Sequence, residues 1–311
     1  MSLTPFDGRI GIIGAGRVGM TLAAGFALAG ADVAAVWSRT LASAEALSRY
    51  APGCSIEATA QRVVDASDLV FVTTADDAIA PTVAGLRWRL GAAVAHCSGA
   101  CDLDVLAAAA AQGALTGSFH PLQAIASPEQ ALAALRGAAV ALAGDDALVA
   151  LLTPLATALG GWPIRVPVGS RALYHASCSF ASPFIVALLR EAGGIWESFG
   201  ISRQDSLRAL LPLLRATLEV AERDGVDAAL GGPLTRGDTG TIVAHLAALH
   251  AAVPQTEPLY RDLSRRLLPI AGTRGTLSLE RAAELAAVLG APDGPSRHEP
   301  STHEPPTDRH R

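Results

Sequence analysis

The sequence has 311 residues, of which 50% are hydrophobic and 17% are charged, enough material for two globular domains. Its formal net charge of −5 argues against a nucleic-acid partner, because such partners require a concentrated basic face. All 24 basic residues are arginine, so mechanisms that need a catalytic lysine or a lysine Schiff base are excluded.

The termini and the cysteines bear on where the protein works. The N-terminus lacks the charged and apolar regions of a signal peptide, and Asp32 interrupts the best apolar run before it is long enough to cross a bilayer. The four cysteines are too few for a disulfide scaffold and lack the spacing of zinc-binding pairs. We therefore expect a soluble, cytoplasmic protein with no membrane partner and no metal site.

The first half of the chain alternates strand and helix patterns. Apolar runs predict strands over residues 9–13, 32–37, 69–73, 92–97, 115–119, 138–143 and 162–166. Helical patterns lie between several of them, over 17–29, 41–50, from Asp77 onward and over 103–112. This alternation predicts an α/β domain over residues 1–168 with a doubly wound, mostly parallel Rossmann sheet.

After Val168 the strand pattern stops. Helical periodicity covers residues 170–199, 203–224, 239–252, 256–271 and 278–289. We expect an all-α domain over 169–290 that binds substrate and forms the subunit contact. Residues 291–311 are rich in Pro, His, Glu and Asp with almost nothing apolar, so we expect a disordered tail.

A glycine-rich loop joins the first predicted strand to the first predicted helix. It reads Gly14-Ala15-Gly16-Arg17-Val18-Gly19, the G-x-G-x-x-G spacing of dinucleotide-binding proteins. In that motif the first glycine permits a tight turn, the second leaves room for the pyrophosphate and the third lets the helix approach the strand. The helix N-terminus then faces the phosphates. The loop therefore predicts a nicotinamide dinucleotide as cofactor.

The end of the second predicted strand indicates which dinucleotide is bound. A site that prefers NAD has Asp or Glu there to bind the ribose 2′-hydroxyl, whereas this sequence has Ser38, Arg39 and Thr40. Those side chains can hold a 2′-phosphate, so we expect NADP, with NAD less favoured. A solvated arginine at a helix start is the alternative interpretation of Arg39.

Two later strand ends should border the ribose, the nicotinamide and the substrate, because ligands of doubly wound sheets lie beyond the carboxyl ends of the strands. Thr73, Thr74 and Asp77 follow one strand and Ser98 follows the next. Asp77 is equally compatible with a role as helix cap.

Reduction of a carbonyl leaves an alkoxide that needs an acid, and histidine is the natural candidate where lysine is absent. His120 follows a predicted strand, and His175 lies near the start of the first helix of the second half. Either histidine could instead be satisfied by backbone groups. Ser98 is a third catalytic candidate, and Ser182 and Gln123 are candidates for contacts with the substrate.

The loop that begins with Gly232-Pro233 interrupts the helical half and contains Arg236 and Asp238. Arginine binds carboxylates bidentately, so Arg236 could receive an anionic substrate. The alternative is an ion pair between Arg236 and Asp238 at a helix start.

Four stretches, GAGRVG, SFHPLQ, YHAS…FASPF and GPLTRGD, together resemble a family that joins a Rossmann-like domain to domain of unknown function 2520. Its architecture is similar to that of 6-phosphogluconate dehydrogenase-like reductases, which include pyrroline-5-carboxylate reductase and ketopantoate reductase. The resemblance implies an oxidoreductase, and some members are regarded as alternative ketopantoate reductases. The family usually has Asn after the FAS triplet, where this sequence has Pro183.

Three hypotheses follow. The first is an NADP-dependent reductase of a small 2-keto acid such as ketopantoate, the second is an imine reductase of the pyrroline-5-carboxylate type, and the third is an NADP-binding sensor or scaffold without turnover. The related architecture also implies a homodimer, and the apolar stripe of residues 207–218 is compatible with one.

Overall fold

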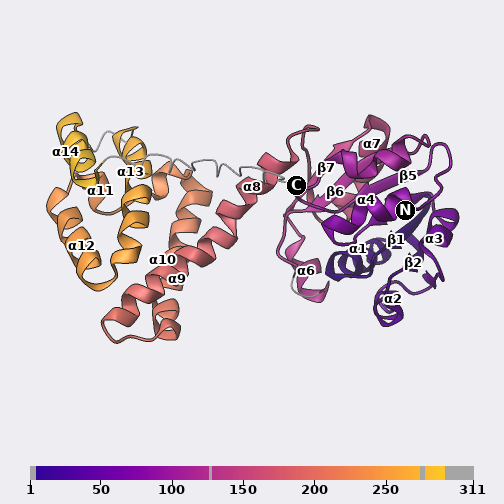
Figure 1. Cartoon of the computed structure of the whole chain (residues 1–311), viewed down its shortest axis with the longest axis horizontal. Helices are drawn as coiled ribbons and strands as arrows, with labels where there is room; N and C mark the ends of the chain where they lie inside the picture. The colour runs from indigo at the N-terminus through magenta and orange to yellow at the C-terminus, as the bar shows by residue number, and fades with distance from the viewer. Residues whose placement is uncertain (1–4, 126–127, 274–276, 291–311) are drawn as a thin grey trace, which may run out of the picture. The chain divides into compact units, whose positions relative to one another are not determined.

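The computed structural model describes residues 5–125, 128–273 and 277–290 (Figure 1). The chain divides into two compact units, Met1–Ser182 and Pro183–Arg311. Helix α8 (Arg171–Ala181) therefore belongs with the sheet, whereas the sequence analysis ended the first domain at residue 168, where the strand pattern stops. The expected tail, 291–311, lies outside the described residues.

The first unit is built on an eight-stranded sheet in the described part of the chain. Its strands are β1 (Arg9–Ile13), β2 (Asp32–Trp37), β3 (Ser55–Ile56), β4 (Leu69–Val72), β5 (Ala93–His96), β6 (Leu115–Pro121), β7 (Ala139–Gly144) and β8 (Trp162–Arg165). They lie in the order β3-β2-β1-β4-β5-β6-β7-β8, and each neighbouring pair is parallel except β6 and β7. The predicted Rossmann-type, mostly parallel sheet is confirmed.

Helices cover both faces of this sheet. They are α1 (Arg17–Leu28), α2 (Leu41–Ser48), α3 (Ala60–Ala66), α4 (Asp76–Ala84), η1 (Leu103–Leu106), α5 (Ala107–Ala110), α6 (Pro128–Ala134) and α7 (Asp146–Ala158). Apolar side chains of α1, α2 and α7 pack on one face, and those of α3, α4, η1 and α5 pack on the other. The sequence analysis assigned neither β3 nor α3, α6 and α7.

Three buried aromatic rings fix α1 against the sheet. Phe26 of α1 lies 5.1 Å from Phe71 of β4 and 6.0 Å from Phe119 of β6, measured between ring centroids, and the latter two rings are 5.4 Å apart. All three side chains are fully buried. Because α1 begins within the glycine loop, at Arg17, this packing also fixes where its N-terminus stands relative to the strand ends.

The second unit is helical throughout its described residues, as predicted. It contains α9 (Pro183–Ser198), α10 (Arg203–Asp224), η2 (Asp227–Ala229), α11 (Pro233–Arg236), α12 (Thr239–Ala252), η3 (Pro254–Thr256), α13 (Glu257–Thr273) and α14 (Leu279–Leu289). Leu234, Ile242, Leu246 and Leu285 are among the residues of its buried core.

The helix expected over residues 170–199 is two helices. Ser182, with φ −133° and ψ −84°, ends α8, and Pro183 begins α9. Proline disfavours helical backbone at the residue before it, and it has no N–H to continue the hydrogen-bond ladder. Pro183 therefore accounts for the break.

Together α8 and α9 form a 28-residue apolar stretch, Arg171–Ser198, with a mean hydropathy of 1.5 over an 18-residue window. By length and composition alone this stretch could cross a membrane, and none of that window is buried in the structure. The sequence analysis found no uninterrupted apolar run of this length, and scattered polar residues do interrupt this stretch, although its average hydropathy stays high. Helices of soluble proteins can have the same length and mean hydropathy.

Candidate active site

The glycine loop has the geometry that its motif predicts. Gly14 has φ +105°, and a Cβ there would lie 2.9 Å from the backbone of Thr73 and Thr74, so only glycine fits. A Cβ on Gly19 would overlap the carbonyl oxygen of Gly14. These two glycines serve the fold itself, because they let α1 approach the strand ends.

Gly16 is different because nothing in the fold requires it to be glycine. Its φ of −80° is ordinary, and the nearest heavy atom to a Cβ at this position would be the carbonyl oxygen of Thr73, 4.0 Å away. Gly16 is exposed and occupies the N-cap of α1, which has neither a capping side chain nor an acidic residue in its first turn. Uncapped N–H groups, a positive helix end and open space beside the backbone together fit a pyrophosphate.

The other loop residues agree with this arrangement. Ala15 is buried, Arg17 is exposed and Val18 is partly buried. The amide of Gly14 donates to the carbonyl of Trp37 at 2.8 Å, which joins the loop to the end of β2. Ser38, the first of the residues predicted to hold the 2′-phosphate, therefore directly follows a residue that contacts the glycine loop.

At the end of β2, Ser38 is partly buried, and Arg39 and Thr40 are exposed. Thr40 occupies the N-cap of α2 without a capping hydrogen bond from its side chain. No hydrogen bond or ion pair of Arg39 occurs among the described residues. The three side chains are free to meet a phosphate.

Thr73, Thr74 and Asp77 stand at the next strand end. The hydroxyl of Thr73 donates to the carbonyl of Gly14, and its amide donates to Ile13 at 2.9 Å, so Thr73 supports the loop. The hydroxyl of Thr74 is buried and has no hydrogen-bond partner within the described chain. Asp77 lies exposed in the first turn of α4, as a helix-start acid would. Of the three, Thr74 has the free polar atom for a ligand.

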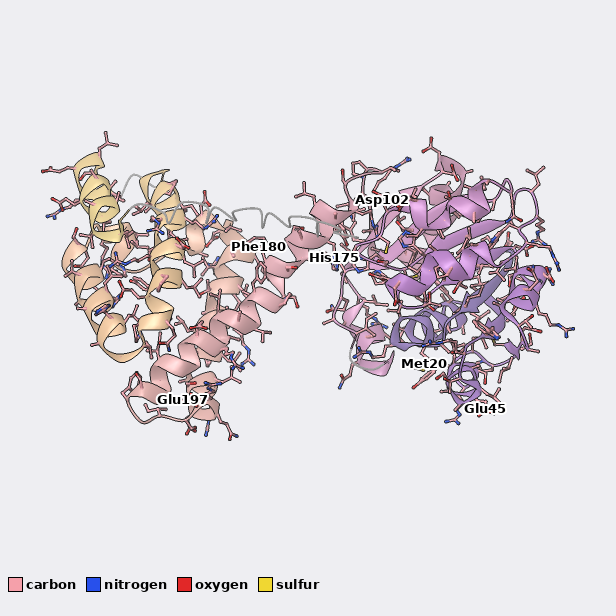
Figure 2. All side chains as sticks on the ribbon, in the orientation of Figure 1. Met20, Glu45, Asp102, His175, Phe180 and Glu197 are labelled. Carbon is pink, nitrogen blue, oxygen red and sulfur yellow. The ribbon has the colours of Figure 1, made fainter. Side chains whose placement is uncertain are left out.

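The ends of β5 and β6 bring together the two histidines that the sequence singled out. Rings of His120 and His175 lie 6.0 Å apart between centroids, and both approach Gly99. A Cβ on Gly99 would stand 2.8 Å from Nε2 of His120 and would overlap His175. Figure 2 shows His175 on α8, on the same side of the first unit as Asp102. Both candidate acids therefore flank one glycine at the sheet edge.

Tyr174 orients His120, and the sequence analysis gave it no role. Its hydroxyl lies 2.9 Å from Nδ1 of His120, and the two rings meet edge to face. Desolvation by burial raises the pKa of Tyr174 to about 12, so this hydroxyl stays protonated at neutral pH.

His120 itself is uncharged at neutral pH. Burial, and then the charges of Arg171 and His175, lower its pKa to about 4. His96, fully buried on β5, has its pKa lowered to about 4 by burial and then by Arg171. His96 pairs in register with Ser118, so these two side chains and His120 project from the same face of the sheet.

Of three other predicted residues, two have local hydrogen-bond partners. Ser98 is buried, and its hydroxyl oxygen accepts from the amides of Ala100 and Cys101 at 3.1 and 3.0 Å. Gln123 donates to the carbonyl of Ala134 at 3.0 Å and accepts from the amide of Ala124 at 2.9 Å. Ser182 is exposed where α8 ends. Ser98 and Gln123 thus have structural roles beside any contact with substrate.

In the second unit, the Gly232–Asp238 loop assigns a local role to most of its members. Thr235 donates to the carbonyl of Gly232 at 2.8 Å, and Gly237 ends α11 with φ +66°. Asp238 caps α12 by accepting from the amide and the hydroxyl of Thr241 at 3.0 and 2.7 Å. Arg236 is exposed, and the described structure shows no ion pair between it and Asp238. The Arg236 guanidinium is thus the polar group of this loop that has no structural role within it.

The sequence matches two family models. One is a Rossmann-like domain over residues 2–121, and the other is the domain of unknown function DUF2520 over residues 138–267. No curated protein matches the chain.

Solved structures share the fold over most of the chain. Protein TM1727 from Thermotoga maritima has a TM-score of 0.69 and 21% identity and covers 86% of this chain and 99% of its own. A Bacteroides fragilis protein, provisionally named an NADP oxidoreductase, has a TM-score of 0.66 and 23% identity. The match covers 85% of this chain and 98% of that protein. A reductive aminase from Aspergillus terreus in complex with NADPH and ethyl levulinate has a TM-score of 0.60 and 21% identity. The match covers 89% of this chain and 98% of that protein.

At these sequence identities, the solved structures show that the fold is shared and nothing more. The two family models, the Rossmann order of the strands and the helical second unit agree with one another. The chain therefore combines a Rossmann-like domain with a DUF2520 domain.

Proposed function

We propose that this protein is an NADP-dependent reductase of a small anionic carbonyl compound, with ketopantoate as the first candidate substrate. The observation that carries the proposal is Gly16, whose missing side chain has no explanation in the fold but matches the approach of a pyrophosphate. The solved reductive aminase of the same fold contains NADPH, which supports the same cofactor here.

The residues present fit this cofactor. The Gly14–Gly19 loop and the N-terminus of α1 would hold the pyrophosphate, and Ser38, Arg39 and Thr40 would hold the 2′-phosphate. The free hydroxyl of Thr74 stands beside them for the ribose or the nicotinamide. When bound, the nicotinamide supplies the hydride, and the protein must orient the substrate and deliver a proton.

The protein's own chemistry would lie at Gly99. His120 and His175 flank this residue, so either imidazole can donate a hydrogen bond to a carbonyl oxygen there. His120 is uncharged at neutral pH and would act by hydrogen bonding. His175 is the other candidate acid. Arg236, Ser182 and Gln123 remain our candidates for holding the substrate, with Arg236 as the partner of its carboxylate.

An imine reductase of the pyrroline-5-carboxylate type is the second candidate. The low pKa of His120 favours it, because a protonated imine brings the proton that a ketone would need from the protein. The fold is also that of a reductive aminase. A third proposal, an NADP-binding sensor or scaffold without turnover, is favoured by Pro183, which stands where the family usually has Asn.

One screen separates the three. Purified protein is assayed for NADPH oxidation against ketopantoate, other 2-keto acids and pyrroline-5-carboxylate, and NADPH binding is measured alongside. Turnover of a keto acid supports the first function, and turnover of the imine alone supports the second. Tight NADPH binding with no turnover favours the third, whereas no binding of either dinucleotide rejects all of them.

We also propose that the protein is a cytoplasmic homodimer whose subunits meet through the helical unit. Apolar side chains on α9 and α10 are exposed in the single chain, including Val186, Leu213 and Leu218, which are 67%, 66% and 58% exposed. Exposed apolar surface of this kind is typical of subunit interfaces.

A further inference from the structure

Arg171 is a fully buried cation in the first turn of α8. Its Nη2 donates to the carbonyl of Ser98, and its Cζ lies 5.5 Å from the ring centroid of Tyr174. Nε and Nη1 have no hydrogen-bond partner, and no carboxylate forms an ion pair with Arg171 in the part of the chain that the structure describes. The sequence analysis did not single out this residue.

A buried guanidinium without a carboxylate costs stability, because it cannot lose its proton and gives up its hydration. Asp102 acts on Arg171 only through its charge, since its oxygens accept from the amides of Leu103 and Gly169 at 2.8 and 2.7 Å. Replacement of Arg171 by an apolar side chain would remove this cost. The presence of an arginine here is therefore not explained by stability and indicates another role.

Of the two groups that Arg171 contacts, one binds His120 directly and the other precedes the glycine beside His120. Tyr174 lies one turn later on α8, and its hydroxyl meets Nδ1 of His120 at 2.9 Å. Ser98 precedes Gly99, whose missing side chain leaves room for Nε2 of His120. A single planar group thus links the aromatic ring that binds His120 to the backbone turn next to it.

This support selects one tautomer of His120. A phenol O–H is a stronger acid than a neutral imidazole N–H, so we expect the hydroxyl of Tyr174 to donate to Nδ1 and the ring proton to reside on Nε2. Nε2 is the nitrogen that lies at Gly99, where the proposed function puts the substrate.

We propose that Arg171 is a positioning residue: by stacking on Tyr174 and binding the Ser98 carbonyl, it fixes His120 as the uncharged Nε2–H tautomer that faces the substrate. The inference rests on the proposed function only for what His120 then does. The fixed positive charge acts in the same direction, since it is the second cause, after burial, of the low pKa of His120. The remaining titratable groups around Arg171 and His120 are His96, Cys97, Cys101, Asp102, Tyr174 and His175.

The test is long-range ¹H–¹⁵N NMR of the histidine rings in the full chain without cofactor, with His120→Gln to assign the signals. We expect wild-type His120 to show the Nε2–H tautomer and to stay uncharged from pH 8 down to pH 5.5. Arg171→Met, which keeps bulk but removes the charge, should mix the two tautomers and raise the titration midpoint. Tyr174→Phe should mix the tautomers, and Arg208→Met, on the exposed surface of α10, should change neither.

Arg171→Lys separates position from charge, because an ammonium retains the charge but lacks the planar fork. We expect it to leave His120 uncharged and still mix the tautomers. If Arg171→Met does not fold by circular dichroism, Tyr174→Phe and Arg171→Lys still decide the matter. Wild-type His120 in the Nδ1–H form, or variants that fold and leave the His120 signals unchanged, would overturn the proposal.

None of these readouts needs turnover, so they distinguish this inference from the proposed function. The predicted spectra in a protein that reduces no substrate would support the positioning role and reject the reductase. If the protein is active, Arg171→Met should lower kcat by up to about 100-fold, as a misplaced reacting group does, with the KM for NADPH unchanged.

Discussion

Nε2 of His120 lies 2.8 Å from the position that a Cβ atom would take on Gly99. The same Cβ would overlap Cδ2 of His175, so one absent methyl group makes room for both imidazoles. Gly99 has no left-handed backbone angle that would require glycine. Its glycine is therefore explained by the two histidines, which suits a site where both must reach one substrate.

Gly99→Ala should fold and lose activity. The added methyl group must displace His120 or His175, and a shift of about 1 Å in a reacting group can lower kcat about 100-fold. The unfolding free energy should fall by no more than the roughly 1–3 kcal/mol typical of an overpacked site. Steady-state kinetics and urea unfolding measure the two effects, and Gly194→Ala, where nothing lies within 4 Å, is the control. Unchanged kcat would remove the histidines from the site.

Gly16→Ala should abolish tight NADPH binding without loss of stability. A Cβ at this position meets open space in the protein, whereas it would occupy the space we assign to the pyrophosphate. We expect the Tm of the unliganded protein to stay unchanged and the Kd for NADPH, from nucleotide fluorescence, to rise at least about tenfold, or roughly 1.4 kcal/mol. Gly14→Ala is the contrasting variant, since its clash with Thr73 and Thr74 should lower the Tm itself. Undiminished NADPH affinity in Gly16→Ala would contradict the cofactor site.

Arg39→Ala should change the choice between the two dinucleotides. Loss of a charge-assisted hydrogen bond of about 1.5–3 kcal/mol should weaken NADPH binding roughly 10–100-fold and leave NADH binding unchanged. Isothermal titration with both nucleotides gives the ratio. Arg49→Ala, at the other end of α2 and equally exposed, is the matched control. Equal affinities for NADPH and NADH in the wild type would refute the NADP assignment.

Stability should fall as the pH falls from about 6.5 to about 4, because His96 and His120 have pKa values near 4 in the folded protein against an ordinary 6.5. In that pH range the two histidines bind protons in the unfolded chain but not in the folded protein, so the unfolding free energy decreases on acidification. Urea unfolding at several pH values measures the slope. His120→Gln should have a shallower slope than the wild type, and identical slopes would show that His120 titrates normally.

The double variant Leu213→Glu and Leu218→Glu should halve the mass in solution if the helical unit forms the dimer. Both side chains are well exposed on α10, so a single chain tolerates charge there, whereas a subunit interface does not. Light scattering after size exclusion gives the mass. Leu279→Glu, 91% exposed on α14, is the control, and a monomeric wild type would rule out the dimer.

The sequence predicted the part of the site that depends on local chain geometry. Strand, glycine loop and helix are consecutive, so their spacing alone indicates the dinucleotide loop. The approach of His120 to His175 was less accessible, because it depends on α8 returning to the sheet edge. Arg171 could not be found in this way: its burial and its contacts with Ser98 and Tyr174 arise only from tertiary packing.

Pro183 shows a local signal whose structural meaning was overlooked. The sequence analysis noted it only as a departure from the Asn usual in the family, and it predicted one continuous helix over 170–199. Proline's effect on the preceding residue was sufficient to predict the break at Ser182. The short elements β3 and α3 escaped for another reason, since two and seven residues are too few to establish a period.

The reversal of β7 limits how far the ligand-binding edge extends. Strands β1, β2, β4, β5 and β6 end at this edge, whereas β7 and β8 run the other way and begin there. His120 therefore terminates a row of strand-end residues that runs from Ser38 after β2, through Gly14 after β1, to β6, and the last two strands lie beyond it. The antiparallel pairing of β6 with β7 thus ends the row at His120, and the carboxyl ends of β7 and β8 lie at the opposite edge of the sheet.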